Sequence, residues 1–474
     1  MRGSLEGKPR VEHAVLTDVD HYLTQRRVAG LRGLSEFLAI PSVSALPNHH
    51  EDVLRAARYL EAAFSAIGLE RVELRETGGA PAVYGEWLHV EGAPTALVYG
   101  HYDVQPVDPE GLWTTPPFAP EVRRGRLYAR GAADDKGQVW MHLQATEALI
   151  RATGGLPVNL KFLIEGEEEI GSLHLGSYVA DHQMELSSDV VVISDSSMYA
   201  PGQPTIVTGL RGLLGLELIV RGPRRDLHSG EYGGAVQNPL HALAELVAGL
   251  HDGEGRVRVA GFYDDVRPLS SSERATLAKL PHDGDQYLAE LGIPAVFGEP
   301  GYSTVERSAV RPTLEVNGLW GGFQGDGAKT VIPAEAHAKI TCRLVPDQDP
   351  RRVYGAVRRH LQEHCPPGVR LEIVSSHEGF PASVVSLDSP YLQAAARALH
   401  GVFGKDPVYS RMGGSIGVVP AFQQILQVPV VLMGFGLAED CIHAPNESFD
   451  LSNYDRGMRA IAAYWLELGA LRAG

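Results

Sequence analysis

The feature that most restricts the fold of this chain is an alternation of short apolar runs with helical segments. TALVYG and VNLKFLI have the length of buried strands, and between them QVWMHLQATEALIRA has apolar residues at helical spacing. The pattern continues with DVVVIS and resumes near the end with PVVLMGF and a last helix, NYDRGMRAIAAYWLELGAL. This alternation predicts an α/β fold with a mixed, mostly parallel sheet and helices on both of its faces.

A second pattern interrupts the first. Strand GLLGLELIV and helix NPLHALAELVAGLHD are followed by strands PTLEVNGLW and AEAHAKITCRLV, helix RRVYGAVRRHLQEH and strand VRLEIVSS. The order β-α-β-β-α-β is that of a ferredoxin-like α+β unit. A chain of 474 residues is also long enough for two cores. We therefore predict one domain from residues 1–207 and 383–474, and an inserted domain from residues 208–382 with an extra excursion at about 253–310.

The composition is that of a globular protein, with 44% hydrophobic and 21% charged residues. A net charge of −16 argues against nucleic acid or an anionic membrane surface as the main partner. The three cysteines, Cys342, Cys365 and Cys441, have no paired spacing, and the N-terminal residues lack the apolar core of a signal sequence. No run approaches the roughly 20 apolar residues that cross a bilayer. We therefore expect a cytoplasmic protein without a membrane span.

Histidines and carboxylates follow the predicted strands of the first domain. Ligands of open α/β sheets bind beyond the carboxyl ends of the strands, so these side chains are candidates for one shared site. Two histidines and five carboxylates stand after a strand or just before a helix: His101, Asp103, Asp134, Glu168, Glu169, Asp195 and His443.

Each of these residues also has a plain structural interpretation. A histidine after a strand is commonly a hydrogen-bonded structural residue, EGEEE is typical of a solvated loop, and the pair Asp134–Asp135 before a helix is typical of an N-cap. Their common place at one edge of the sheet favours a shared ligand, and converging negative charges need a cation. Imidazole and carboxylate donors without thiolate suit zinc, manganese or cobalt. Three ligand carboxylates and a hydroxide would balance two divalent ions, roughly 3.5–4 Å apart.

Eight segments of the chain occur together in one known family: GHYDVQP, RLYARGAADDKG, EGEEEIGS, SDSS, DLHSGEYGG, GAKTVIPAEAHAKITCRLVP, GGSIG and CIHAPNE. Through them the chain resembles the dinuclear metallopeptidases that include cytosolic non-specific dipeptidase and carnosinase. Glutamate carboxypeptidases, aminoacylases and desuccinylases are more distant members. The resemblance covers nearly the whole chain. It implies a homodimeric enzyme that hydrolyses dipeptides or short peptides with two divalent metal ions per subunit.

The resemblance also implies roles for the residues after the strands. His101 and Asp195 would bind one metal ion, Glu169 and His443 the other, and Asp134 would bridge them. Asp103 would orient His101. Glu168 would act as general base towards a bridging, metal-activated hydroxide. The Asp134–Asp135 peptide would be cis.

The inserted domain would supply the remaining groups. His228 would reach into the active site of the partner subunit and stabilise the oxyanion, so the dimer would be the catalytic unit. Arg343, with Thr330, Ser415 and Gly414, would bind the terminal carboxylate of the substrate. The residues alone leave two alternatives open, namely a strand-end salt bridge for Arg343 and a capped loop histidine for His228.

One departure from the family pattern concerns the amino end of the substrate. Close dipeptidases read REGGS where this chain reads RMGGS, so Met412 replaces a carboxylate. An aspartate at Asp195 resembles the di- and tripeptidases, whereas many carboxypeptidase relatives have glutamate there. A dipeptidase is therefore favoured, and a deacylase of N-acyl amino acids on the same dinuclear site is the alternative.

Two other classes of function deserve comparison. GGSIG fits the G-x-S-x-G pattern of serine hydrolases, and Asp440 and His443 follow Ser415 in the order of their triad. That fold takes its acid and its histidine from different loops, however, and the upstream histidine and carboxylates would have no role. A non-catalytic relative would be expected to lack a ligand or the base, whereas this chain has all five ligands, Asp103 and Glu168.

Overall fold

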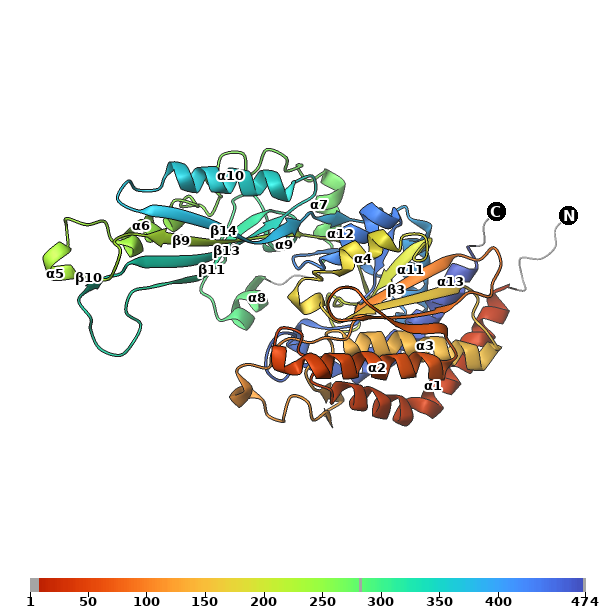
Figure 1. Ribbon diagram of the computed structural model, residues 1–474. Helices are drawn as coiled ribbons and strands as arrows, with labels where there is room; N and C mark the ends of the chain where they lie inside the picture. The colour runs from red at the N-terminus through yellow and green to blue at the C-terminus, as the bar shows by residue number, and fades with distance from the viewer. Residues whose placement is uncertain (1–7, 281–283, 472–474) are drawn as a thin grey trace.

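The computed structural model describes residues 8–280 and 284–471, which form two lobes (Figure 1). The first lobe is built on a nine-stranded sheet in the order β1-β2-β6-β3-β7-β17-β8-β15, with β16 also paired to β8. Its strands are β1 (Glu70–Arg75), β2 (Ala82–Trp87), β3 (Thr95–His101), β6 (Asn159–Glu165), β7 (Val190–Ile193), β8 (Thr205–Leu210), β15 (Ser383–Val384), β16 (Val408–Met412) and β17 (Val430–Leu432).

The central strands of this sheet are parallel. β3 pairs in parallel with β6 and β7, and β17 pairs in parallel with β7. Antiparallel pairs flank them, β1 with β2 and β2 with β6 on one side, and β8 with β17 and β15 on the other. The predicted mixed sheet is confirmed, and its parallel centre places the carboxyl ends of β3, β6 and β7 at one edge.

Helices cover both faces of the sheet, as predicted, because successive strand residues point to opposite sides. Ala96 and Val98 of β3 join the core formed with α1, α2, α3, α11 and α13, whereas Leu97 and Tyr99 join the core formed with α4 and α12. These helices are α1 (Lys8–Leu38), α2 (His50–Ile67), α3 (Lys136–Thr153), α4 (Leu175–Asp181), α11 (Pro390–Phe403), α12 (Val418–Ala421) and α13 (Leu451–Gly469). Short 3-10 turns occur at η1 (Pro47–His49), η2 (Glu110–Leu112), η3 (Glu168–Ile170) and η5 (Ala438–Asp440), and η4 (Phe422–Leu426) is a π-helical turn.

The second lobe is the interrupting unit. Its four-stranded antiparallel sheet has the order β11-β13-β9-β14, and α6 and α10 pack on it around a separate apolar core. The expected β-α-β-β-α-β order is confirmed by β9 (Gly212–Arg221), α6 (Pro239–Ala248), β11 (Thr313–Gly321), β13 (Glu335–Leu344), α10 (Pro350–Glu363) and β14 (Arg370–Phe380). A small two-stranded antiparallel sheet pairs β10 (Leu227–His228) with β12 (Val331–Ile332), and α5 (Ser229–Tyr232) follows β10.

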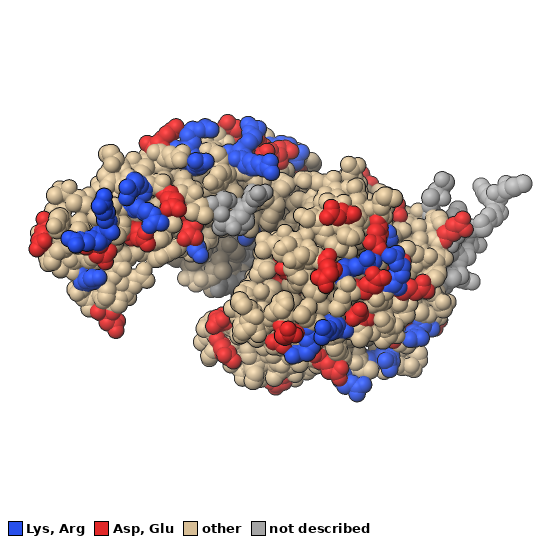
Figure 2. Space-filling model, viewed as in Figure 1, with Lys and Arg blue, Asp and Glu red and all other residues tan. Residues whose placement is uncertain are grey.

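The two lobes are joined at β8 and β15. The chain leaves the large sheet after Leu210 and returns at Ser383, and these two residues pair with each other. The excursion before β11 contains α7 (Ser271–Leu277), α8 (Gly284–Leu291) and α9 (Thr304–Ala309), and its apolar residues pack against Tyr199 and Val408 of the first lobe. A hollow separates the lobes elsewhere (Figure 2).

A small three-stranded sheet completes the first lobe, in the order β18-β5-β4. Its strands are β4 (Glu121–Arg123), β5 (Arg126–Tyr128) and β18 (Ser448–Asp450). Within the described ranges, no helix is both long and apolar enough for a bilayer span.

Candidate active site

The five predicted metal ligands come from five separate segments at the carboxyl edge of the large sheet. The last residue of β3 is one of them, two others follow β6 and β7, one precedes α3, and one lies in the loop after η5. In that order they are His101, Glu169, Asp195, Asp134 and His443.

Asp134 lies at the centre of this group. Its Oδ1 is 3.1 Å from Nε2 of His101, and its Oδ2 is 2.9 Å from Nε2 of His443. The same nitrogen of His443 is 3.3 Å from Oε2 of Glu169, and that of His101 is 3.9 Å from Oδ2 of Asp195. The two oxygens of Asp134 therefore face two different sets of donors. This donor set fits two cations that share one carboxylate.

Asp103 contacts the Nδ1 side of the His101 ring, while Nε2 faces Asp134. Nδ1 of His101 is 3.1 Å from the main-chain oxygen of Asp103 and 3.4 Å from its Oδ1. The carboxylate of Asp103 also accepts the main-chain N–H groups of Glu168 at 3.2 Å and Glu169 at 3.1 Å, and the hydroxyl of Ser44 at 2.6 Å. One buried carboxylate therefore fixes both the histidine and the turn that carries the two glutamates.

The electrostatics of the group show an excess of negative charge. Burial, with Asp134 nearby, raises the pKa of Asp195 to about 7, and burial likewise raises the pKa values of Glu168 and Glu169. Hydrogen bonds to Asp134 and Glu169 raise the pKa of His443 to about 10. For an acidic cluster of this kind, a bound cation supplies the missing positive charge.

Two plain structural interpretations from the sequence are wrong. Asp135 is at the N-cap position of α3, but its side chain does not cap the helix, because its Oδ2 instead accepts the N–H of His101 at 3.3 Å. The EGEEE segment is not a solvated loop either, since Glu165 and Glu167 are buried and Glu165 accepts the hydroxyl of Tyr99 at 2.6 Å. The Asp134–Asp135 peptide is cis, as the resemblance implied.

Sequence reasoning missed Glu447. This buried carboxylate accepts the main-chain N–H groups of Gly131, Ala133 and Asp134 at 3.0–3.1 Å and pairs with Arg130 at 2.8 Å. It therefore holds the loop that presents Asp134. The one available signal was its place in CIHAPNE, the segment that also contains His443.

Arg343 and Ser415 come together where the two lobes meet. Nη1 of Arg343, on β13, donates to Oγ of Ser415 at 2.7 Å, and Ser415 donates to the main-chain oxygen of Arg211. Burial and the neighbouring Arg343 lower the pKa of Arg211 to about 10. Arg343 has no ion pair among the described residues, so the salt-bridge alternative is wrong. Arg211 donates from Nε to the carbonyl of Gly413 at 2.9 Å, so two guanidinium groups beside Gly413 and Ser415 make a positive position suited to a carboxylate.

His228 and Thr330 lie away from the metal-ligand candidates of their own chain. His228 pairs with Val331 in the two-stranded β10–β12 sheet, which Figure 1 places at the end of the second lobe farthest from α3. The ring is exposed, and its Nδ1 accepts the N–H of Gly230 at 3.0 Å. Thr330 adjoins it, since its carbonyl accepts the N–H of Ser229. Within one chain, His228 therefore has the capping contact that the residues alone left open.

The geometry argues against the serine-hydrolase alternative. In the described part of the chain, Ser415 bonds only to Arg343 and to the Arg211 carbonyl. His443 faces Asp134 and Glu169 instead, and Asp440 pairs with Arg126 and accepts the N–H of Leu437. The serine therefore lacks the histidine that would act as its base.

The comparisons with known proteins identify the family of the chain. The model of Peptidase family M20/M25/M40 matches residues 97–467. The chain belongs to this family. It is 33% identical over 453 residues to the Cys-Gly metallodipeptidase DUG1 of Candida albicans, covering 91% of this chain and 93% of the relative. It is 31% identical over 480 residues to the Beta-Ala-His dipeptidase of Homo sapiens, covering 98% and 94%.

A solved structure shows the same fold over nearly all of the chain. The M20 family metallo-carboxypeptidase Sso-CP2 from Sulfolobus solfataricus superimposes with a TM-score of 0.86 at 34% identity, covering 93% of this chain and 99% of the other. The predicted resemblance to dinuclear metallopeptidases is confirmed at the level of the family, and with it the assignment of the chain as a peptidase.

Proposed function

We propose that the chain hydrolyses dipeptides or very short peptides with two divalent cations. The observation that carries this proposal is the place of Asp134, whose two oxygens face His101 and His443 separately. His101 and Asp195 would bind one ion, and Glu169 and His443 the other. The relatives named as dipeptidases support the substrate class. The donor set suits zinc or manganese, with cobalt as a third option.

The proton transfers are assigned to Glu168. Cations bound at the site would polarise the scissile carbonyl and lower the pKa of the attacking water. Glu168 is close enough to His101 and Asp195 to interact with both electrostatically, and its main chain is fixed by Asp103. Burial raises the pKa of Glu168, which suits a carboxylate that accepts a proton from water and then gives it to the leaving amine.

The carboxylate-binding position of Arg343, where the two lobes meet, would limit the length of the substrate. Arg343 would pair with the terminal carboxylate, assisted by Ser415 and Gly414. Thr330 lies beside His228 at the other end of the second lobe, so it would assist only from a partner subunit. We divide the chain into a catalytic domain of residues 1–207 and 383–474 and a lid and dimerisation domain of residues 208–382. Closure of the hollow between the lobes would exclude water and folded proteins (Figure 2).

The proposed enzyme acts as a homodimer. His228 is exposed at the outer end of the second lobe, where it can enter the site of a partner subunit and stabilise the oxyanion.

The expected location is the cytoplasm, in keeping with three free cysteines.

A second candidate function is the deacylation of N-acyl amino acids at the same site. Met412 favours it, because its side chain packs against the apolar core beside α12 and offers no charge to a free α-amine. The two functions share the cations, Glu168 and Arg343, and differ only at the amino end of the substrate.

The proposed function is tested by stripping the protein with a chelator and restoring zinc, manganese or cobalt. Dipeptides and N-acyl amino acids are then assayed in parallel. We expect activity to vanish with the metal and to return with it, and the better substrate class decides between the two candidates. Activity that persists after metal removal and is abolished by a fluorophosphonate would overturn the proposal in favour of Ser415.

A further inference from the structure

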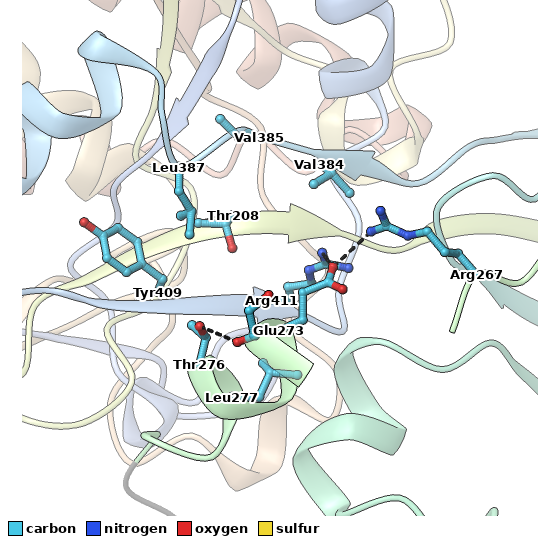
Figure 3. Close-up of a pocket in the computed structure, with 11 residues that line it drawn as sticks. Thr208, Arg267, Glu273, Thr276, Leu277, Val384, Val385, Leu387, Tyr409 and Arg411 are labelled. Atoms are coloured by element: carbon cyan, nitrogen blue, oxygen red, sulfur yellow. Dashed lines mark hydrogen bonds and ion pairs between the residues drawn. The ribbon is translucent and has the colours of Figure 1, made fainter. Parts of the chain in front are cut away.

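A separate cavity lies where α7 packs against the edge of the large sheet (Figure 3). Its volume is about 260 Å³, and its walls come from α7, β8, β15 and β16. In the sheet, β17 and β8 stand between β16 and β7, the strand that precedes Asp195. The cavity is therefore distinct from the metal-ligand candidates.

One end of the cavity is positively charged. Arg267 and Arg411 point toward Glu273 in Figure 3, and their Nη2 atoms are 2.9 and 2.8 Å from its Oε1. The other oxygen of Glu273 accepts the N–H of Ser270 at 2.9 Å and its hydroxyl at 2.7 Å. The carboxylate thus has its full set of donors, while two guanidinium groups share one negative charge.

The two arginines keep donors for a further acceptor. In the described part of the chain, each donates hydrogen bonds from Nη2 alone, so Nε and Nη1 of both are available. The side chain of Arg411 is only 14% exposed, so water has limited access to its guanidinium. A partly desolvated guanidinium with unused N–H groups gains more from an anion than one in open solvent does.

The rest of the cavity is mostly apolar, with the hydroxyl-bearing residues Thr208, Ser272 and Thr276 also in its lining. Leu277 of α7 lies on one side, Val384 of β15 and the following Val385 lie on the other, and the ring of Tyr409 extends the wall along β16 (Figure 3). The volume is below the roughly 300–1,000 Å³ typical of pockets for drug-sized molecules. The cavity therefore suits a small molecule with one charged and one apolar end.

We propose that this cavity binds a small organic acid, whose carboxylate pairs with Arg411 and Arg267 and whose apolar group packs between Leu277 and Val385. Two sources share this chemistry. One is an apolar amino acid, which peptide hydrolysis would release, and the other is an acid without an amino group.

Calorimetric titration of the metal-loaded protein tests the proposal. The probes are 4-methylpentanoate, leucine, and 4-methylpentanamide as a neutral analogue of the same shape. We expect the acid to bind at least tenfold more tightly than the amide. Comparable binding of leucine identifies amino acids as the source, and binding of 4-methylpentanoate alone identifies other organic acids.

Single substitutions test whether the acid binds in this cavity. Arg411→Met and Arg267→Met are each expected to weaken binding of the acid tenfold or more. Arg397→Met, which removes a similar exposed arginine paired with Glu467, should leave it unchanged. Because carboxylates also bind metal ions, Asp134→Ala is titrated as well and should retain the binding.

Three results would overturn the proposal. These are equal binding of acid and amide, binding that survives both arginine substitutions, and binding that is lost in Asp134→Ala but kept in Arg411→Met. Arg411 also ties α7 to β16, so its loss could disturb the fold. Arg267 is 55% exposed, and its substitution keeps the test decisive in that case.

Discussion

Arg130 and Glu447 are 317 positions apart in the chain, yet they form a buried ion pair of 2.8 Å directly beside the loop of Asp134. The pair links the loop that precedes α3 to the segment between His443 and β18. The position of one metal-ligand candidate therefore depends on a residue near the other end of the sequence.

Replacement of Glu447 by alanine should destabilise the protein strongly. It leaves Arg130 buried without its partner and removes the acceptor of three main-chain N–H groups, so we expect a loss of roughly 3–5 kcal/mol in the free energy of unfolding. Urea unfolding with chelator present measures it without metal-linked effects. Glu467→Ala removes the exposed pair with Arg397 and should cost only about 0–1 kcal/mol. Equal effects of the two substitutions would contradict the structural role of Glu447.

Glu168→Gln should keep the bound metal and lose turnover. The amide has nearly the shape of the carboxylate but cannot accept the proton from water, so kcat should fall roughly 10²–10⁴-fold. Metal content by mass spectrometry and kcat are measured together. Glu167→Gln is the matched control, because Glu167 adjoins Glu168 but pairs with His174 at 2.7 Å. A base at Glu168 is refuted if the variant retains near-normal kcat.

His228→Ala should lower kcat roughly 10²–10³-fold, because one donor to the oxyanion is lost, while the unfolding midpoint stays unchanged. If the residue acts across a dimer, mixing this variant with Asp134→Ala restores sites that combine an intact cluster with a partner's intact histidine. With equal mixing and free exchange of subunits, half of the dimers contain one of each variant, and one of their two sites is complete. The mixture should then recover about a quarter of the wild-type activity. A mixture no more active than its components would show that His228 does not act in the partner's site.

Met412→Glu should shift the preference toward substrates with a free α-amine. A carboxylate at this position can pair with an ammonium group, and we expect kcat/KM for dipeptides relative to N-acyl amino acids to rise about tenfold. Met412→Gln has a similar length without charge and serves as the control. The same ratio in both variants would mean that charge at this position does not select the substrate.

His142 should make the protein less stable in acid. Its ring is buried in α3 with Nε2 2.8 Å from Oγ of Ser194, and burial lowers its pKa to about 3. Below about pH 6.5 the unfolded chain binds a proton at this histidine, whereas the folded chain does not. The free energy of unfolding therefore falls by up to about 1.4 kcal/mol per pH unit below that point. His142→Gln removes this loss. Relative to wild type, the variant should gain stability by about 2 kcal/mol between pH 7 and pH 5.

Urea unfolding of both proteins in the presence of chelator, at pH 7, 6 and 5, measures this gain. If the difference in free energy of unfolding between wild type and variant is the same at all three pH values, His142 does not cause the loss of stability in acid.

The sequence predicted the elements well where burial dictates the pattern. Strands buried on both faces appear as continuous apolar runs, so β3, β6, β7 and β17 were all identified. Most of the metal-ligand candidates were found because they stand within a few residues of the end of such a run or before a helix, and His443 because it lies in the loop that follows β17 and η5. The pattern within one segment was sufficient for these predictions.

Features that depend on pairing between distant segments were not predictable. Nothing in the local pattern of β17 shows that it lies between β7 and β8, and the burial of Glu447 depends on Arg130 and on the loop it supports. The anchoring of α7 on β16 by Arg411 also joins two segments with no shared pattern. These relationships are set by tertiary packing, which periodicity along one segment does not record.

The place of β17 has a consequence for the growing chain on a ribosome. β7 and β8 are consecutive strands, but they are separated in the sheet by a strand that is synthesised only after the entire second lobe. Until then the first lobe has an open slot with two unpaired strand edges, which are prone to pairing with other chains. The nascent protein therefore passes through a prolonged aggregation-sensitive stage, during which the second lobe can already fold on its own core.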